Sequence, residues 1–561
     1  MDIGDIEDLG VGAGLEEPRK KVTNTVRKSL KNYKIRKQGD TQDKPSESIP
    51  GTQKIMVRTF GCSHNVSDSE FMMGQLSEYG YRFTSTEDEA DLYFVNSCTV
   101  KNPSQEGMIS LIKRAKDMKK PVVISGCVPQ GDRNLKGLDG CSIVGITQID
   151  RVVEVVEESL KGNVVRLLAK KELPTLDLPK VRKNALIEII PISTGCLGSC
   201  TYCKTKHARG KLGSYDPQAI IDRAIQACEE DVKQIWITSE DTGAYGRDIG
   251  TNLPALLRGI IKELPDDVML RIGMTNPPFI LEHKKAIAEI LRHPQVFEFL
   301  HIPVQSGNDP VLERMNREYT IEEFNELCDY MNKHVPGITL ATDIICGFPT
   351  ETEKEFEDSM ELVRKYQFRV INISQFYSRP GTVAAKMPKV NSKDVKKRSQ
   401  RITQLFESYR TTNFLADTRQ RIWVSEMDDK NADMMVGHTK NYTKILIPRD
   451  EALMGKSVIV DIIETHMWHA VGKIIDSNPK PLIQEVGAAN FQVKTGDDFK
   501  MPKNDKKITP VVEDAADQTE ATQTPTKGGI SSGLIAAGLG LLVAALGLYL
   551  VPFLMTNTPD L

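Results

Sequence analysis

Three cysteines, Cys196, Cys200 and Cys203, lie in one short stretch of this 561-residue chain and constrain its chemistry more than any other feature. Their spacing allows a single loop to place three thiolates around one face of an iron–sulfur cubane. Three thiolates on four irons leave one iron open, and an open iron can bind an external molecule and transfer an electron to it. The spacing therefore predicts a [4Fe-4S] cluster with one free coordination position.

Two simpler sites are alternatives for part of this stretch. Cys200 and Cys203 alone can form half of a zinc site or a thioredoxin-like redox pair. A zinc site needs a second Cys or His pair at matching spacing, and none follows in the next thirty residues, where His207 is the one histidine. The full pattern of three cysteines favours the cluster.

A second set of cysteines follows three apolar runs that are typical of strands, at residues 54–60, 91–96 and 121–125. Cys62, Cys98 and Cys127 come after these runs. Helical patterns between the runs predict crossover connections, which make the strands parallel and bring their carboxyl ends to one edge. Three small core cysteines are the alternative. The repeated placement after a strand favours a second metal site in one crevice.

The hydrophobic pattern predicts an α/β protein with several domains. Six apolar strands alternate with helices in the middle of the chain, which predicts an incomplete (β/α)6 barrel with the Cys196 loop at its carboxyl face. Five short strands after Arg421 predict a small OB-like β-barrel. We expect a disordered tail at 1–52, an α/β domain at 53–162, a linker at 163–184, the incomplete barrel at 185–410, the small barrel at 411–476, a polar linker at 477–529 and a carboxyl-terminal anchor at 530–555.

The anchor rests on an uncharged run of 23 residues between Gly533 and Met555. Such a helix is roughly 34 Å long, enough to cross a hydrocarbon core of about 30 Å. Ten cysteines and no amino-terminal signal peptide favour a reducing compartment. The sequence therefore predicts one transmembrane helix, a single-pass tail anchor in the endoplasmic reticulum membrane, with all catalytic domains in the cytosol.

A basic helix is predicted just before the small barrel. It carries five cationic residues, Lys393, Lys396, Lys397, Arg398 and Arg401. Clustered cations of this kind bind nucleic-acid phosphates. Together with the small barrel, they are the expected RNA-binding surface.

Several short motifs between residues 54 and 476 resemble those of the radical S-adenosylmethionine (SAM) methylthiotransferases. They are Gly61-Cys62-Ser-His-Asn65, Asn96-Ser-Cys98, Ser125-Gly-Cys127, the Cys196 loop, Pro303-Val-Gln-Ser-Gly307, Gly347-Phe-Pro-Thr-Glu351 and Ser378-Arg-Pro-Gly-Thr382. The small barrel is similar to the TRAM domain of that family. The resemblance implies two [4Fe-4S] clusters, with SAM serving as both methyl donor and radical source.

The resemblance also assigns expected roles to residues of this chain. Cys196, Cys200 and Cys203 are expected to hold the SAM-binding cluster, and Cys62, Cys98 and Cys127 an auxiliary cluster. Glu240, Gln305 and Ser306 are the further candidates for contacts with SAM. For Glu240, a helix cap or an ordinary salt bridge is the alternative.

Within the family, the Gly61 motif and the apolar carboxyl terminus are similar to the branch that methylthiolates C2 of N6-threonylcarbamoyladenosine, at position 37 next to the anticodon of tRNA. That carbon has no acidic proton and no leaving group, so it requires radical chemistry. Such a reaction also needs a tRNA anticodon stem-loop, an external electron donor and a sulfur source. The same chemistry on isopentenyladenosine or on a ribosomal-protein aspartate is an alternative. A non-catalytic, membrane-anchored iron–sulfur protein is a more distant one.

Overall fold

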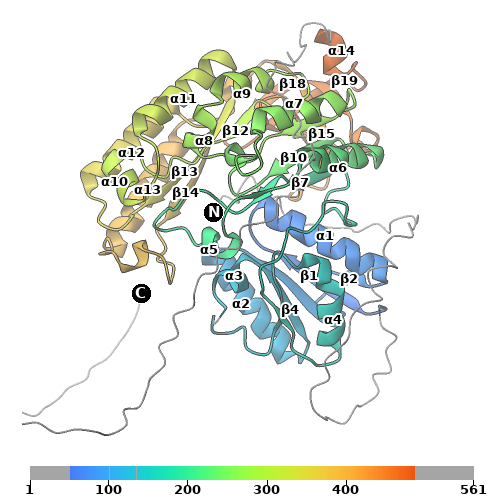
Figure 1. Ribbon diagram of the computed structural model, residues 1–561. Coiled ribbons are helices and arrows are strands. Elements are labelled where there is room, and N and C mark those ends of the chain that lie inside the picture. Colours follow the sequence, from blue (N-terminus) through green and yellow to red (C-terminus); the bar gives the residue numbers. More distant parts are fainter. Residues whose placement is uncertain (1–50, 100–101, 134, 487–561) are drawn as a thin grey trace, which may run out of the picture. The chain divides into compact units, whose positions relative to one another are not determined.

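A computed structural model describes residues 51–99, 102–133 and 135–486 (Figure 1). The first part of the described chain is a six-stranded sheet in the order β2-β1-β3-β4-β5-β6, with every neighbouring pair parallel. Its strands are β1 (Lys54–Thr59), β2 (Arg82–Thr84), β3 (Leu92–Ser97), β4 (Val122–Gly126), β5 (Ser142–Val144) and β6 (Arg166–Leu167). Its helices are α1 (Ser63–Tyr79), α2 (Asn102–Asp117), α3 (Cys127–Gly131) and α4 (Val152–Leu160), the last preceded by the 3-10 turn η2 (Ile149–Arg151).

Neighbouring residues on the central strands β1, β3 and β4 belong to different hydrophobic cores. Phe94 packs in the cluster that includes α1 and α4, whereas Val95 packs in the cluster that includes α2. Because successive side chains of a strand point to opposite faces, helices must cover both faces of the sheet. Figure 1 shows this arrangement, with α1 and α4 on one side and α2 on the other.

The middle of the chain contains six further parallel strands in two three-stranded groups, β11-β10-β7 and β12-β13-β14. A parallel bridge between Leu270 and Val296 connects the groups. The strands are β7 (Ile187–Pro191), β10 (Gln234–Thr238), β11 (Met269–Arg271), β12 (Phe299–His301), β13 (Thr339–Cys346) and β14 (Val370–Gln375). The parallel strands all present their carboxyl ends to the same side, where barrel active sites lie.

Helices alternate with these strands and begin at residues with strong capping signals. Asp216 caps α6, and capping boxes at Thr320 and Thr352 start α11 and α12. The longer helices are α6 (Pro217–Glu229), α7 (Leu253–Glu263), α9 (Lys284–Leu291), α11 (Ile321–His334), α12 (Glu353–Tyr366) and α13 (Ser392–Ser408). The shorter elements are β8 (Ser193–Thr194), α5 (Thr205–Arg209), β9 (Gly213–Ser214), η3 (Thr242–Ala244), α8 (Pro277–Leu281), α10 (Asp309–Arg314), η4 (Ala384–Lys386) and η5 (Asn413–Leu415).

A closed five-stranded barrel in the order β15-β16-β17-β19-β18 follows. Its elements are β15 (Arg419–Met427), β16 (Met434–Thr439), β17 (Lys444–Pro448), η6 (Glu451–Leu453), β18 (Ser457–Thr465) and β19 (Ala470–Asp476), with α14 (Leu482–Val486) after it. Trp423 and Tyr442 pack against Phe297. The centroid of the Phe297 ring lies 5.7 Å from that of Trp423 and 4.9 Å from that of Tyr442. The half-buried Lys440 ammonium donates to the carbonyl of Leu291 at 3.2 Å. The small barrel is thus fastened to the middle domain.

The predicted fold class is wrong in its last element, the transmembrane helix. None of the helices within residues 51–99, 102–133 and 135–486 has the length and apolar character needed to cross a membrane. The predicted anchor at 530–555 lies outside those ranges, as do nearly all of the predicted tail at 1–52 and most of the linker at 477–529. The predicted single-pass tail anchor and the endoplasmic reticulum location are therefore withdrawn. The prediction rested on the length of the run and its lack of charge, which are requirements for a membrane-spanning helix but do not establish one.

Candidate active site

The auxiliary cysteines stand at the carboxyl ends of three neighbouring strands. Cys62 follows β1 and is the N-cap residue of α1, Cys98 follows β3, and Cys127 follows β4 as the first residue of α3. Cys98 and Cys127 are buried and Cys62 is half-buried. Because β1, β3 and β4 are adjacent and parallel, their ends lie at one edge of the sheet.

The Asn65 side chain connects the three strand ends. Its Nδ2 donates to the carbonyl of Phe60, just after β1, at 2.9 Å and to the carbonyl of Ser97, at the end of β3, at 3.0 Å. Its Oδ1 accepts a hydrogen bond from the Cys127 thiol at 3.7 Å. One buried amide thus holds together the three places from which the auxiliary cysteines project.

The residue before Cys62 must be glycine. Gly61 has φ of +103°, and a Cβ there would stand 2.6 Å from the Cys98 sulfur. Only glycine accepts both that backbone conformation and that approach. Its small size brings the loop that carries Cys62 directly against Cys98.

The other three cysteines lie on the loop between β8 and α5, and all are half-buried. The Lys206 ammonium donates to the loop carbonyls of Leu197 at 3.1 Å and Gly198 at 2.9 Å. A Cβ on Gly198 would stand 3.6 Å from the Cys196 sulfur and 3.9 Å from the Cys200 sulfur. The two thiols therefore border one space that a larger side chain at Gly198 would fill.

An arginine from a distant part of the chain contacts this loop. Arg317 Nη1 lies 3.2 Å from the Cys200 sulfur, and its Nη2 donates to Asn276 Oδ1 at 2.5 Å. Asn276 Nδ2 in turn donates to Asp241 Oδ2 at 2.8 Å. Burial raises the pKa of Asp241 to about 6, although Asn276 opposes the shift. Burial, with Asp241 adding to it, also raises the pKa of the Cys196 thiol to about 12.

The two cysteine sets approach each other across the domain boundary. Helices α3 and α5, which follow the two sets, are so close that a Cβ on Gly131 would stand 3.6 Å from the Ala208 side chain. Burial lowers the pKa of Arg379, while Cys98 of one set and Cys203 of the other both act to raise it. One guanidinium thus lies within electrostatic reach of both sets.

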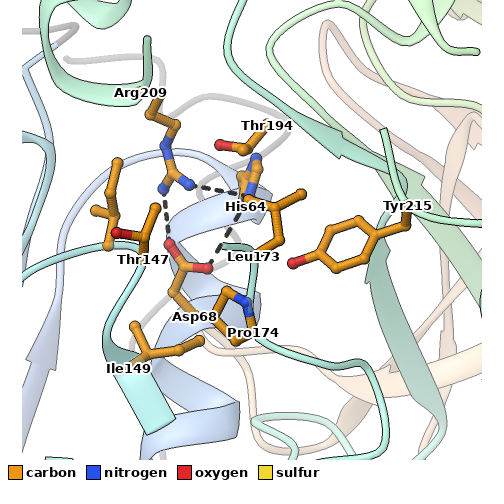
Figure 2. A pocket seen from close by; sticks show the side chains of 10 residues that line it. His64, Asp68, Thr147, Ile149, Leu173, Pro174, Thr194, Arg209 and Tyr215 are labelled. Atoms are coloured by element: carbon orange, nitrogen blue, oxygen red, sulfur yellow. Dashed lines mark hydrogen bonds and ion pairs between the residues drawn. The ribbon is translucent and has the colours of Figure 1, made fainter. Parts of the chain in front are cut away.

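Behind the cysteines, Arg209 of α5 contacts side chains of α1. Figure 2 shows its guanidinium pointing toward His64 and Asp68, with Arg209 Nη2 2.7 Å from Asp68 Oδ2 and Nη1 2.9 Å from His64 Nε2. Thr194 and Tyr215 border the same narrow pocket of about 10 Å³. That volume is barely enough for one water molecule. This pocket is therefore too small to hold SAM.

The three predicted SAM contacts lie in different settings. Both carboxylate oxygens of Glu240 have partners within the protein. Its Oε2 accepts from the Gly195 amide at 2.9 Å, and its Oε1 lies 3.0 Å from both His64 Nδ1 and Arg209 Nε. Burial alone would raise the pKa of Glu240, but His64 and Arg209 outweigh it and lower the pKa. Glu240 thus forms the salt bridge that was the alternative prediction for it.

Gln305 and Ser306 follow β12 at the carboxyl side of the strands. Gln305 has φ of +69° and forms a parallel bridge with Ile344. The buried hydroxyl of Ser306 has no hydrogen-bond partner among the described residues. An unsatisfied buried hydroxyl is costly unless a ligand or water completes it.

The basic helix has two kinds of cation. Lys393, Lys396 and Lys397 on α13 are exposed. Arg398, in contrast, is buried and donates to Glu351 Oε2 at 2.9 Å, and Arg401 donates to Glu357 Oε2 at 2.5 Å. The expectation that Arg398 contacts phosphate is therefore wrong, because its charge is already neutralised inside the domain.

Sequence reasoning missed Arg209, Arg317 and Asn276. Arg209 is remote in sequence from His64 and Asp68, and Arg317 is remote in sequence from Cys200 and Asn276. The available signal was position: Asn276 belongs to a polar turn after β11, and Arg209 is followed by Gly210 with φ of +82°. Neither signal identifies a partner.

The donor sets fit iron–sulfur clusters. All ten cysteines are among the described residues, and none is in a disulfide. No group of three His, Cys, Asp or Glu side chains in the described ranges is gathered as one bare ion requires. A cubane spreads its cysteines over several irons, so that its ligands do not have to converge on one point.

The fold and the Cys196 loop define a radical SAM protein. Residues 190–363 match the family model described as the Radical SAM superfamily, and residues 54–139 match the one described as Uncharacterized protein family UPF0004. The radical SAM match implies a [4Fe-4S] cluster and SAM.

Two curated relatives give the particular family. The Threonylcarbamoyladenosine tRNA methylthiotransferase of Homo sapiens is 49% identical over 82% of this chain and 82% of its own length. The Probable threonylcarbamoyladenosine tRNA methylthiotransferase of Pyrococcus abyssi is 34% identical over 75% of this chain and 99% of its own length. This chain belongs to the threonylcarbamoyladenosine tRNA methylthiotransferase family, and it is a sulfur-group-transferring radical SAM enzyme.

Among solved structures, the radical SAM methyltransferase TsrM of Kitasatospora setae matches with a TM-score of 0.44 and 14% identity, over 59% of this chain and 77% of TsrM. That likeness is too low to support an argument about this chain.

Proposed function

We propose that this protein methylthiolates C2 of N6-threonylcarbamoyladenosine at position 37 of tRNA, giving the 2-methylthio nucleoside. The observation that carries the proposal is the close approach of the two cysteine sets, because α3, which begins at Cys127, packs against α5, which follows the Cys196 loop. A transfer of sulfur to an unactivated carbon needs a radical source and a sulfur carrier at one substrate atom. The names of the relatives support the tRNA nucleoside as substrate.

In this proposal each cysteine set holds one [4Fe-4S] cluster. Cys196, Cys200 and Cys203 hold the cluster that binds SAM, and Cys62, Cys98 and Cys127 hold the auxiliary cluster. When bound, these groups supply the radical and the sulfur. The chain supplies position and charge: Arg317 places its cation beside Cys200, and Arg379 lies within electrostatic reach of Cys98 and Cys203.

Of the predicted SAM contacts, we propose that Gln305 and Ser306 act directly and that Glu240 acts through the loop. The unsatisfied Ser306 hydroxyl supports a ligand at that position. Glu240 instead holds the amide of Gly195, the residue before Cys196. It therefore fixes the base of the cysteine loop.

The exposed lysines of α13 support a phosphate-binding surface for the anticodon stem-loop. Arg398 is held in a buried ion pair, but the described contacts include no ion pair for Lys393, Lys396 or Lys397. Bases in a single-stranded loop are the least costly to turn out toward an enzyme. The reaction also requires an external electron donor and a sulfur source.

Mass spectrometry of tRNA nucleosides tests the function. Cells that lack the gene should accumulate N6-threonylcarbamoyladenosine and lose its 2-methylthio derivative, and the purified enzyme with SAM and a reductant should restore it. Loss of 2-methylthio-isopentenyladenosine instead would identify the other tRNA substrate. A methylthio mark missing from a ribosomal-protein aspartate would identify a protein substrate, and no change in any of them would favour a non-catalytic protein.

A further inference from the structure

Two buried ion-pair networks connect helix α1 to the radical SAM domain. One is centred on Arg209 and includes Asp68 of α1. The other is centred on Glu188 of β7, which pairs with Lys180 at 3.0 Å and Arg223 at 3.0 Å, and Lys180 also pairs with Glu70 of α1 at 3.2 Å. Both networks lie out of contact with solvent, but in the described contacts only the first reaches the cysteines.

The Arg209 network forms a continuous chain of contacts from one cysteine set to the other. On one side, Arg209 Nη2 donates at 2.8 Å to Asn65 Oδ1, the same atom that accepts from the Cys127 thiol. On the other side, Arg209 Nε lies 3.0 Å from Glu240 Oε1, and Glu240 Oε2 accepts from the Gly195 amide. Cys196 follows Gly195 directly in the sequence.

Two guanidinium nitrogens of Arg209 donate hydrogen bonds in this network, and the third is at ion-pair distance from Glu240. Arg209 Nη1 donates to His64 Nε2, Nη2 donates to Asp68 and Asn65, and Nε forms an ion pair with Glu240 Oε1. Burial alone would lower the pKa of Arg209, but Asp68, Cys127 and Glu240 outweigh it and raise the pKa. The charge is therefore permanent. A planar guanidinium presents donors in several directions and can contact all of these groups at once, whereas the compact ammonium of a lysine cannot.

We propose that Arg209 is a positioning residue that fixes the auxiliary cysteines relative to the radical cysteines. This inference rests on the proposed function, in which sulfur from one site and a radical from the other must meet at one carbon. Misplacement by about 1 Å can cost about 100-fold in rate. Besides its electrostatic contact with the Cys127 thiol, Arg209 acts through Asn65 on one side and Glu240 on the other.

The test replaces Arg209 with lysine in the full chain, with both clusters loaded. We expect iron content and SAM cleavage to stay near those of the unaltered enzyme, because both cysteine sets remain complete. The yield of methylthiolated nucleoside per 5′-deoxyadenosine should fall by about 10- to 100-fold. The magnetic interaction between the two reduced clusters, measured by electron paramagnetic resonance, should also change, and this readout does not depend on activity.

Arg223→Lys is the matched control. Arg223 is equally buried at the same domain boundary but contacts Glu188, with no described link to a cysteine. It should alter stability while leaving both the product ratio and the magnetic interaction unchanged. An unchanged ratio and interaction in R209K, or an equal effect of R223K, would overturn the positioning role.

Asp68→Asn provides a second variant if R209K does not load iron. It keeps the shape of the side chain and weakens one contact to Arg209, so the product ratio should fall in the same direction by a smaller factor. A fully loaded D68N enzyme with an unchanged ratio would count against the proposal. Failure of the unaltered enzyme to methylthiolate tRNA would refute the proposed function itself, whereas an active enzyme with unchanged variants would refute only the role of Arg209.

Discussion

The two cysteine sets differ in how the chain builds them. Cys196, Cys200 and Cys203 lie within one half-buried loop, so that their spacing alone brings them together. The auxiliary cysteines come from three strand ends and meet only because β1, β3 and β4 are neighbours in a parallel sheet. A local set tolerates rearrangement of the rest of the fold, whereas a set made by topology depends on every contact that holds the strand ends in register.

Glycine variants should give the largest effects and should separate the two sets. Gly195→Ala places a Cβ 2.1 Å from the Lys211 carbonyl at φ of +79°, so it should remove iron from the radical set. Gly61→Ala should displace Cys98 and remove iron from the auxiliary set. Iron content and the electronic spectrum of each purified variant measure the loss.

Gly140→Ala is the control for backbone strain alone. Gly140 has φ of +70°, but nothing lies within 4 Å of the Cβ that alanine would add. This variant should retain both clusters. Full iron content in G195A or G61A would contradict the close packing described here.

Loss of Arg317 should affect one set and spare the other. Arg317→Met removes the cation beside Cys200, so SAM cleavage should fall by about 10- to 100-fold while the auxiliary iron is retained. Arg314→Lys is the control, since the Arg314 side chain pairs with Glu355 and no cysteine. Deoxyadenosine release at equal protein concentration measures the effect. Equal rates in R317M and the unaltered enzyme would show that the contact with Cys200 does not contribute to SAM cleavage.

The contrast between the two sets also marks how far the sequence predicts the site. The Cys196 loop follows from spacing, and the placement of Cys62, Cys98 and Cys127 follows from strand patterns and crossover rules. Contacts that cross domains do not follow. Glu240 was a candidate for SAM binding because its loop is polar, yet its partners, His64 and Arg209, lie on elements that no local pattern brings together.

Charge on α13 shows the same limit. Five cations on one predicted helix suggested one phosphate-binding face, but the helix also has to pack. Arg398 is on its buried side, where it donates to Glu351, next to an amide contact from Gly347 to the same carboxylate. Composition gives the number of cations, and only tertiary contacts show which of them are available.

Thiol labelling of the iron-free protein should distinguish the two cysteine sets by the reactivity of their individual cysteines. Half-buried Cys200 and Cys203 should react with iodoacetamide before buried Cys98 and Cys127. Burial raises the pKa of the Cys127 thiol to about 12, with Arg209 opposing. Since the thiolate is the reactive form, labelling of Cys127 should rise about tenfold per pH unit between about pH 8 and 10. Peptide mass spectrometry identifies the order, and early labelling of Cys127 would contradict its burial.

Neutralising the exposed lysines should have the smallest effect and should leave both cysteine sets intact. Replacement of Lys393, Lys396 and Lys397 by glutamine should reduce the salt dependence of tRNA binding by about one phosphate contact per lysine. Arg398→Gln should instead destabilise the fold, because it leaves Glu351 buried without its cation. Equal salt slopes for the triple lysine variant and the unaltered enzyme would exclude this surface as a phosphate-binding site.

The central claim is that the two cysteine sets have separate tasks, and exchange of each set for alanine tests it most directly. Under one reductant, iron, deoxyadenosine and methylthiolated nucleoside are measured for both triple variants. Loss of Cys196, Cys200 and Cys203 should abolish both products. Loss of Cys62, Cys98 and Cys127 should leave deoxyadenosine formation and abolish methylthiolation. Methylthiolated tRNA from the auxiliary triple variant would contradict the account.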